Sequence, residues 1–384
     1  MARSISLKQA YWFLAACGAL YVTFISILCT SWAQKHAVYI HKLHTLWWHD
    51  VDKPEQFGFL KNQVQPLHIT TPDGETLYAW HIVPIAKYIA NEDHLINEHT
   101  TSATPFQDSV GFDLLSKDPN SRLVINFHGN AGTVAQGWRT DAYRSLSAGA
   151  PDKIHVLAVD YRGFGLSTGT PDEQGLITDG IATVRWAMDV AKISPERIVL
   201  VGQSLGTAVA AAVAEHFVRV SEVEFAGIVL IAAFSDLPTL LLTYSISGLI
   251  PVLSPLRPYP RLQRFFLGFL RDRWDTASRI TDLVRKSQKV NLHLIHSKDD
   301  FDISWKHSES LFYAAANATS PSGLSMKQIE AVKLRQDLHE GGSLESWNSD
   351  GMKRIAKQIV RYGGHNRITT YPCIARTVQH IFEQ

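Results

Sequence analysis

The residues with the clearest capacity for chemistry are a serine and the two glycines that flank it, in the pattern Gly202-x-Ser204-x-Gly206. An aliphatic run precedes this pattern at 198–201, and an alanine-rich stretch follows it at 208–214. Between a strand and a helix, such a pattern sets the serine on a sharp turn that the glycines keep free of side-chain clashes. The N-terminus of the following helix favours developing negative charge. We therefore expect Ser204 to be a nucleophile rather than an ordinary turn serine.

A serine hydroxyl becomes a good nucleophile when a histidine accepts its proton and an acid orients that histidine. In enzymes with a strand–serine–helix turn, the acid and then the histidine follow the serine along the chain. Three carboxylates come directly after the apolar run 292–296, namely Asp299, Asp300 and Asp302. Neighbouring residues cannot all point at one histidine, so one of the three is the expected acid, and the pattern alone does not choose among them.

The histidine should follow the last strand, expected within 352–361, and precede a closing helix that starts near Tyr371. His365 has this position, directly after two glycines that leave room for its loop. His339 is the competing candidate, but it precedes the final strand. We expect His365 to be the base.

An oxyanion hole needs two backbone N–H groups aimed at the developing negative charge. One should belong to Leu205, which follows the nucleophile. The other should come from the loop His128-Gly-Asn-Ala-Gly after the first long strand, and Asn130 is the expected donor. Small residues there let the backbone approach a substrate closely. His128 is expected to organise this loop rather than to act as a base.

These candidates follow the strands of an alternating pattern that begins at residue 122, in which apolar runs alternate with helical stretches. Continuous apolar strands alternating with helices are typical of a parallel sheet covered on both faces. We expect this α/β domain to span 61–384, with a hairpin at its start. The polar segment 85–120 is expected to be an inserted surface loop with at most one short helix.

Residues 237–289 interrupt the alternation with an apolar, proline-broken segment that is too long for a simple connection. Because it follows the carboxyl end of a strand, we expect a short helical lid that offers apolar surface to an acyl chain. A pair of ordinary core helices is the alternative.

The N-terminus carries an uncharged apolar stretch from Ala10 to Trp32. As a helix it would be about 34 Å long, enough to cross a bilayer. A signal peptide is the alternative, since Ser31-Trp32-Ala33 resembles a cleavage site, but the stretch exceeds the usual apolar core of such peptides. We expect a retained transmembrane anchor at 1–33. Basic residues flank it on both sides, so charge does not set its orientation; the sequon at Asn317 permits a lumenal domain.

The juxtamembrane segment 34–60 contains four histidines, His36, His41, His44 and His49. A metal site is one interpretation, but no cysteine and no regular ligand spacing supports it. We expect an interfacial segment on the membrane surface, with Trp47 and Trp48 dipping in, and no metal.

Composition narrows the class of protein further. The chain has 384 residues, of which 45% are hydrophobic, and its formal net charge of +1 argues against a nucleic-acid partner. Its three cysteines, of which Cys17 and Cys29 lie in the N-terminal apolar segment, exclude a disulfide framework.

Several motifs together carry a family resemblance over roughly 50–384. They are His128-Gly-Asn-Ala-Gly-Thr133, Asp160-Tyr-Arg-Gly-Phe-Gly-Leu-Ser-Thr-Gly-Thr-Pro171, Gly202-Gln-Ser-Leu-Gly-Thr207 and Lys298-Asp-Asp300, with Asp52-Lys-Pro-Glu-Gln-Phe-Gly58 and Trp80-His-Ile-Val-Pro84 upstream. The chain resembles the membrane-anchored monoacylglycerol and lysophosphatidylserine lipases of the α/β-hydrolase superfamily.

The resemblance implies an α/β-hydrolase fold and a single-pass endoplasmic-reticulum protein with a lumenal catalytic domain. It also implies Ser204 as nucleophile, Asp300 as acid and His365 as base. The chain departs from the family at Gln203, where the relatives usually carry histidine, and after the acid, where Phe301-Asp-Ile-Ser304 replaces a Pro/Val-rich run. A polar insertion at about 318–350 is a third departure.

The sequence therefore predicts a membrane-anchored serine hydrolase that cleaves carboxylic esters of monoacyl lipids, with no metal or organic cofactor. An acyl-protein thioesterase is the alternative, because the same residues cleave thioesters. A non-catalytic membrane protein that keeps the fold for partner binding is a third possibility. The sequence favours no particular head group or oligomeric state.

Overall fold

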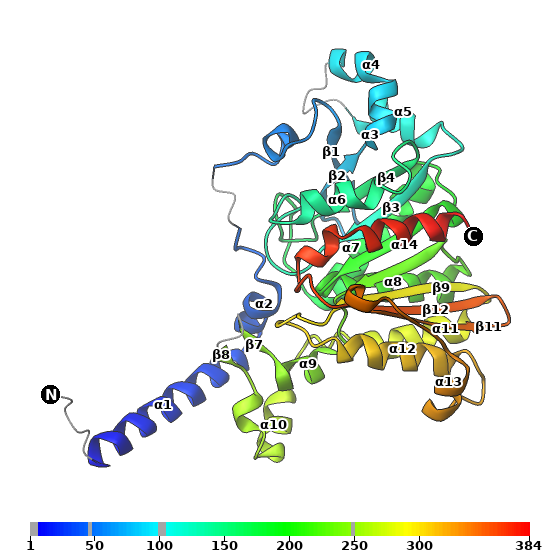
Figure 1. Cartoon of the computed structure of the whole chain (residues 1–384). Helices are drawn as coiled ribbons and strands as arrows, with labels where there is room; N and C mark the ends of the chain where they lie inside the picture. The colour runs from blue at the N-terminus through cyan, green and yellow to red at the C-terminus, as the bar shows by residue number, and fades with distance from the viewer. Residues whose placement is uncertain (1–6, 45–47, 99–104, 247–249) are drawn as a thin grey trace.

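The continuous apolar runs of the sequence form the centre of a ten-stranded sheet in the computed structural model, which describes residues 7–44, 48–98, 105–246 and 250–384 (Figure 1). The six central strands pair in parallel. In order across the sheet they are β4 (Ile154–Val159), β3 (Arg122–Phe127), β5 (Ile198–Gln203), β6 (Gly227–Ile231), β9 (Val290–Ser297) and β12 (Lys353–Val360). Parallel neighbours need crossover connections, and the crossover helices bury both faces of these strands.

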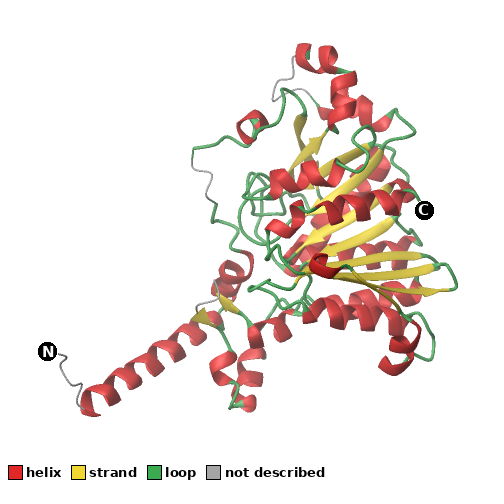
Figure 2. Ribbon diagram, in the orientation of Figure 1, coloured by secondary structure: helices red, strands yellow, loops and turns green. Residues whose placement is uncertain are grey.

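Alternate residues of each strand enter separate cores on the two faces. In β3, Leu123 and Ile125 belong to the larger core, whereas Val124 belongs to the smaller one. Figure 2 shows helices on both sides of the sheet. The larger core is covered by α7 (Glu173–Arg185), α8 (Leu205–Ser221), α11 (Thr276–Lys286) and α12 (Lys306–Ala318), and the smaller by α6 (Arg139–Ser147) and α14 (Pro372–Phe382). The predicted α/β fold with a mostly parallel sheet is confirmed.

Antiparallel strands extend the sheet at both edges. The hairpin of β1 (Val64–Thr70) and β2 (Thr76–Ile82) joins at β4. At the other edge, β11 (Ser343–Ser349) pairs with β12, and β10 (Leu334–Asp337) pairs with β11. These last two strands, together with α13 (Met326–Val332), come from the polar insertion, for which the sequence analysis proposed no strand.

The insertion is polar because several of its inner side chains form a charged network, beside the buried apolar residues Ile329 and Trp347. Glu345 of β11 accepts from Lys333 at 2.8 Å and from Lys357 of β12 at 3.0 Å. All three side chains are buried or nearly so. Buried charges need such pairing. Because charged residues occupy buried positions here, the sequence of the insertion does not show the apolar alternation typical of a strand.

The expectation of at most one short helix in 85–120 was wrong. The described part of this segment contains α3 (Ile85–Ala90), α4 (Glu92–Asn97) and α5 (Val110–Ser116). Tyr88 and Leu95 are buried together with Val83 in a small separate core. Each helix is short and buries only one or two of its residues, too few to produce a periodic sequence signal.

The segment 237–289 divides into two parts. Near its start lie α9 (Leu237–Thr243), the short strands β7 (Ser245–Ile246) and β8 (Ile250–Pro251), and α10 (Pro260–Leu267). The part from α9 to α10 lies off the sheet (Figure 1). Leu237 and Leu240 of α9 reach the larger core, and α11 is anchored in it by Ile280, Leu283 and Val284. We call residues 237–271 the cap.

The N-terminal helix α1 (Leu7–Leu28) extends away from the sheet (Figure 1). Within the described residues, it is the helix long and apolar enough to cross a membrane, with a mean hydropathy of 1.8. A second helix, α2 (Ser31–Tyr39), follows and packs on the domain: Tyr39 is fully buried, and its hydroxyl donates to Asp272 at 2.7 Å. Trp48 is exposed, whereas Trp47 lies outside the described residues.

Close packing of α8 against the sheet makes Gly206 sensitive to substitution. A Cβ at Gly206 would lie 1.9 Å from the carbonyl oxygen of Phe127. We expect Gly206→Ala to lower the free energy of unfolding by about 1–3 kcal/mol or more, the cost of overpacking, as measured by thermal unfolding in detergent. At Gly341 the nearest atom to an added Cβ is 3.4 Å away. Gly341→Ala is therefore the control, and equal stability of the two variants would contradict the packing argument.

Candidate active site

A cavity of about 530 Å³ opens at the carboxyl ends of the central strands. Ser204, Leu205, Asn130 and His365 all line it, so the fold brings four of the expected site residues to one space. Asp300 lies directly behind His365, in contact with it. Ligand sites of α/β sheets lie at this edge because the strand-to-helix loops converge there.

Ser204 occupies a strained turn between β5 and α8. Its φ of 54° and ψ of −119° are rare for a residue with a side chain. The Ser204 N–H donates to the carbonyl of Ile231 at 2.9 Å, which fixes the turn to β6. A Cβ at Gly202 would lie 2.2 Å from the Gly206 carbonyl oxygen, so only glycine fits there. The close packing at Gly202 and the hydrogen bond to Ile231 maintain this strained conformation, which places Ser204 beyond the carboxyl end of β5.

His365 and Asp300 form a hydrogen-bonded pair. Nδ1 of His365 lies 2.8 Å from Oδ2 of Asp300. With the proton on Nδ1, the other ring nitrogen keeps a lone pair that can accept a proton from a nucleophile. The His365 side chain is 12% exposed at the cavity wall, whereas the Asp300 carboxylate is fully buried.

Asp300 is held as a carboxylate by several donors. Its Oδ1 accepts from the N–H groups of Asp302 and Ile303, both at 2.9 Å. Its Oδ2 also lies 3.2 Å from Nε2 of His296. Burial alone raises the pKa of Asp300, but the hydrogen bonds from His296 and His365 outweigh it and hold the pKa well below its usual range.

The three neighbouring carboxylates have different partners, although the sequence left them equivalent. Asp299 accepts from the N–H of Gly364 at 2.8 Å and from the Ser297 hydroxyl. It therefore fixes the loop of His365 through the backbone. Asp302 lines the cavity, and of the three only Asp300 has a hydrogen bond to the imidazole of His365 in the described structure.

The loop after β3 is shaped by the N-terminal segment. The N–H of Ala131 donates to the carbonyl of Tyr39 at 2.8 Å, and the N–H of Gly132 donates to that of Leu43 at 2.9 Å. Because the amides of Ala131 and Gly132 already donate to these carbonyls, neither is available to bind an oxyanion. Asn130 lines the cavity. Leu205 is the first residue of α8, where amides have no acceptor within the helix.

His128 and His339 lie in different surroundings. His128 is buried, with Nδ1 2.6 Å from the Gly129 carbonyl oxygen and Nε2 3.1 Å from Asp160. Burial lowers the pKa of His128. Its contacts join its own loop to the end of β4, which fits the expected role of a loop organiser. His339 is exposed on the turn between β10 and β11 and does not line the cavity.

The described residues contain one group whose side chains lie close enough to hold a metal ion, formed by Asp300, Asp302 and His365. Two of its members are the hydrogen-bonded pair described above, so their ligand atoms already have partners. The histidines at 36, 41, 44 and 49 do not belong to this group.

A family model described as "Alpha/beta hydrolase family" matches residues 124–332, more than half of the chain. The chain belongs to this family. The model covers β3, the serine turn, the cap and the Asp300 loop, and it ends before the strand that leads to His365. The predicted family is confirmed.

Curated relatives share modest identity with this hydrolase. Human Protein ABHD12B is 29% identical over 256 residues, which are 65% of this chain and 62% of that protein. The uncharacterized protein YfhR of Salmonella typhi is 30% identical over 199 residues, 50% of this chain and 59% of that protein. The chicken lysophosphatidylserine lipase ABHD12 is 25% identical over 78% of this chain and 70% of that protein. The chain thus spans about 60% of the length of the first two relatives.

Solved structures share the fold of this hydrolase. A Vibrio vulnificus alpha-beta hydrolase superposes with a TM-score of 0.55 at 13% identity, covering 94% of this chain and 92% of its own. A Pyrococcus furiosus esterase gives a TM-score of 0.50 at 16% identity, covering 86% and 93%.

Two positioning side chains of the hydrolase were missed by the sequence analysis. Gln203 precedes the serine, and its amide donates to the carbonyl of His365 at 3.2 Å, so it holds the histidine loop against the turn. Its position in the motif was noted only as a departure from the family. The second is His296 of β9, which orients Asp300 and whose Nδ1 lies 2.8 Å from the Ser308 hydroxyl.

Arg139 of α6 was also missed. Its Nη2 donates to the carbonyls of Gly129, Asn130 and Ala131 at 3.0, 3.1 and 2.7 Å, and its Nη1 donates to that of Thr133. One guanidinium therefore fixes most of the loop that carries Asn130. No motif marks this arginine in the sequence, because its partners are carbonyl groups of the backbone.

We expect Arg139→Lys to lower kcat for ester hydrolysis by on the order of 10²-fold with little change in KM, because a small displacement of a catalytic group has this effect. A lysine keeps the charge but cannot bond all of these carbonyls at once. Arg144→Lys on the same helix is the control, since Arg144 contacts Asp141 and the carbonyl of Phe57 instead. Unchanged kcat in Arg139→Lys, at a melting temperature equal to wild type, would contradict the positioning role.

Proposed function

We propose that this hydrolase is a membrane-anchored serine hydrolase that cleaves the carboxylic ester of monoacyl lipids, such as monoacylglycerols or lysophospholipids. One observation carries the proposal: the strained Ser204 and the Asp300–His365 pair meet at a cavity that is lined largely by aliphatic and aromatic side chains. The polar groups named above share this space with apolar side chains of the cap, among them Leu240, Phe266 and Leu270. A single acyl chain with a polar ester matches this combination.

In the first half of the reaction, the Ser204 hydroxyl attacks the acyl carbonyl while Nε2 of His365 takes its proton. The carbonyl oxygen becomes an oxyanion, which the N–H groups of Leu205 and Asn130 stabilise. His365 then gives the proton to the leaving alcohol oxygen, the ester C–O bond breaks, and the acyl group remains on Ser204.

In the second half, His365 takes a proton from water, and the resulting hydroxide attacks the acyl-serine carbonyl. The fatty acid leaves, and Ser204 regains its proton from His365. Throughout, the Asp300 carboxylate holds the Nδ1 proton and stabilises the imidazolium that forms twice. These steps consume one ester and one water, and they use no metal or organic cofactor.

The choice of lipid rests on the cavity wall and on the relatives. Among the curated relatives, several are lysophosphatidylserine lipases by name. Apolar side chains of the cap line the same cavity as Ser204, and an apolar wall binds an alkyl chain through the hydrophobic effect. Both favour a lipid ester over a small water-soluble one.

The proposal includes the location of the protein. Residues 1–33 act as the anchor, 34–60 as a segment at the membrane surface, and 61–384 as the catalytic domain. The length and hydropathy of α1 support the anchor, although a signal sequence would have the same properties. We further propose the endoplasmic reticulum, with the catalytic domain in the lumen, from the resemblance to the membrane-anchored lipases.

The direct test is labelling of membranes with a fluorophosphonate, together with fatty acid release from monoacylglycerol and lysophospholipid. We expect wild type to be labelled and active, Ser204→Ala to lose both, and His365→Ala to lose at least about 10³-fold in kcat, since the residues of a triad act as a unit. Absence of both labelling and lipolysis in wild type would contradict the proposal. Labelling with turnover of thioesters alone would indicate the acyl-protein thioesterase instead.

A matched pair of variants tests the acid. Asp300→Asn should lower kcat by about 10⁴-fold, because the amide stabilises the wrong tautomer of His365. Asp299→Asn keeps an oxygen that can accept from the N–H of Gly364. Its kcat should therefore fall by no more than about tenfold, which corresponds to the free energy of about one hydrogen bond. Equal losses in the two variants would exclude Asp300 as the specific acid.

A further inference from the structure

The membrane helix forms part of the wall of the catalytic cavity. Ile25 and Leu28, in the last turn of α1, and Cys29, which follows it, line the same cavity as Ser204. Ile25 is 3% exposed, whereas most of α1 is exposed. A helix that served only as a tether would have no reason to enter the active-site cavity.

The cap holds this end of α1 in place. The hydroxyl of Tyr21 donates to the carbonyl of Val252 at 2.8 Å. Ile25 packs in one apolar cluster with Val252 and Leu253 of the cap. Phe266 and Leu267 of α10 join the same cluster, so α10 lies beside the last turns of α1, as Figure 1 shows.

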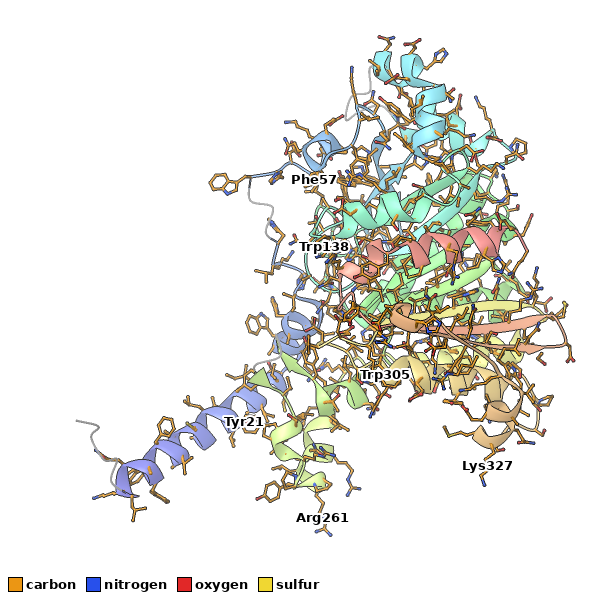
Figure 3. All side chains as sticks on the ribbon, viewed as in Figure 1. Tyr21, Phe57, Trp138, Arg261, Trp305 and Lys327 are labelled. Atoms are coloured by element: carbon orange, nitrogen blue, oxygen red, sulfur yellow. The ribbon has the colours of Figure 1, made fainter. Side chains whose placement is uncertain are left out.

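The outer surface of the cap beside α1 combines apolar and basic side chains. Leu262, Phe265 and Phe269 are exposed on or just after α10. Between residues 237 and 271 the chain contains four arginines and no acidic residue. In Figure 3, Arg261 lies at the far end of α10, on the side of the molecule from which Tyr21 and α1 extend. Exposed aromatic residues with adjacent arginines are typical of a surface at the boundary between lipid headgroups and acyl chains.

We propose that the C-terminal end of α1 and the cap residues 252–267 form an acyl-chain subsite that receives its ligand directly from the bilayer. This inference rests on the proposed function and adds the route by which the lipid substrate enters the cavity. The lipid moves laterally past Leu28 between α1 and α10, so its chain stays in apolar surroundings until its ester reaches Ser204. The alkyl chain then lies against Ile25, Leu28 and the cap.

The test compares two substitutions on adjacent residues of the full-length protein in lipid nanodiscs. Leu28→Trp fills the subsite, whereas Ile27, which is 51% exposed and does not line the cavity, serves for the control Ile27→Trp. We expect Leu28→Trp to lower kcat/KM for a long-chain monoacylglycerol by about tenfold or more, the effect of a steric change in an apolar pocket. Fluorophosphonate labelling and hydrolysis of p-nitrophenyl acetate should stay within about twofold of wild type, and Ile27→Trp should change none of these. Equal loss of long- and short-chain turnover in Leu28→Trp, or no loss of either, would overturn the subsite.

A binding measurement separates this inference from the proposed function. Ser204→Ala protein is incubated with a long-chain monoacylglycerol that carries a diazirine near its terminal methyl group, irradiated, and mapped by peptide mass spectrometry. We expect adducts on residues 25–29 and 252–267. An excess of unlabelled monoacylglycerol should suppress these adducts, and they should be absent in Leu28→Trp. Adducts confined to other segments would overturn the subsite even if the enzyme cleaves lipid esters. Adducts at these residues in a protein without esterase activity would support the subsite and contradict only the proposed reaction.

Discussion

The contact between the start of α8 and the end of β3 determines the geometry of the whole site. Gly206 lies so close to the carbonyl of Phe127 that a single methyl group would collide with it. The chain must therefore turn sharply at the end of β5, and Ser204 takes a conformation that a residue with a side chain rarely adopts. The same turn makes Leu205 the first residue of α8. A single packing constraint therefore positions both the nucleophile and one candidate oxyanion amide.

The remaining groups lie on loops, which are fixed by hydrogen bonds from strand ends, from neighbouring loops and from α6. Asp300 lies among backbone N–H groups and His296, which keeps it ionised in a buried position. Asp299 and Gln203 hold the loop of His365 through the N–H of Gly364 and the carbonyl of His365. Arg139 holds the loop that carries Asn130. The sheet sets where the loops begin, and these contacts set where the side chains point.

Much of the fold and part of the site were predictable because their signals are local in the sequence. Fully buried parallel strands are recognisable as apolar runs, and the serine turn has its own motif with flanking glycines. The choice of Asp300 over Asp299 was not predictable from spacing, because it depends on which carboxylate reaches the imidazole across a tight turn. The strands of the insertion were missed because the buried side of β11 combines the charged Glu345, paired with Lys333 and Lys357, with Trp347, so no apolar run marks the strand. Arg139 and the role of α1 were missed because each depends on contacts between distant segments.

The most direct test of the account is detection of the acyl-enzyme. Wild-type protein in detergent is mixed with a long-chain monoacyl ester, quenched with acid within milliseconds to seconds, digested and analysed by mass spectrometry. The account predicts an added acyl mass on the peptide that contains Ser204, formed before fatty acid accumulates and more persistent in Asp300→Asn. Ester cleavage without any acyl-peptide, or an acyl group on a different residue, would contradict it.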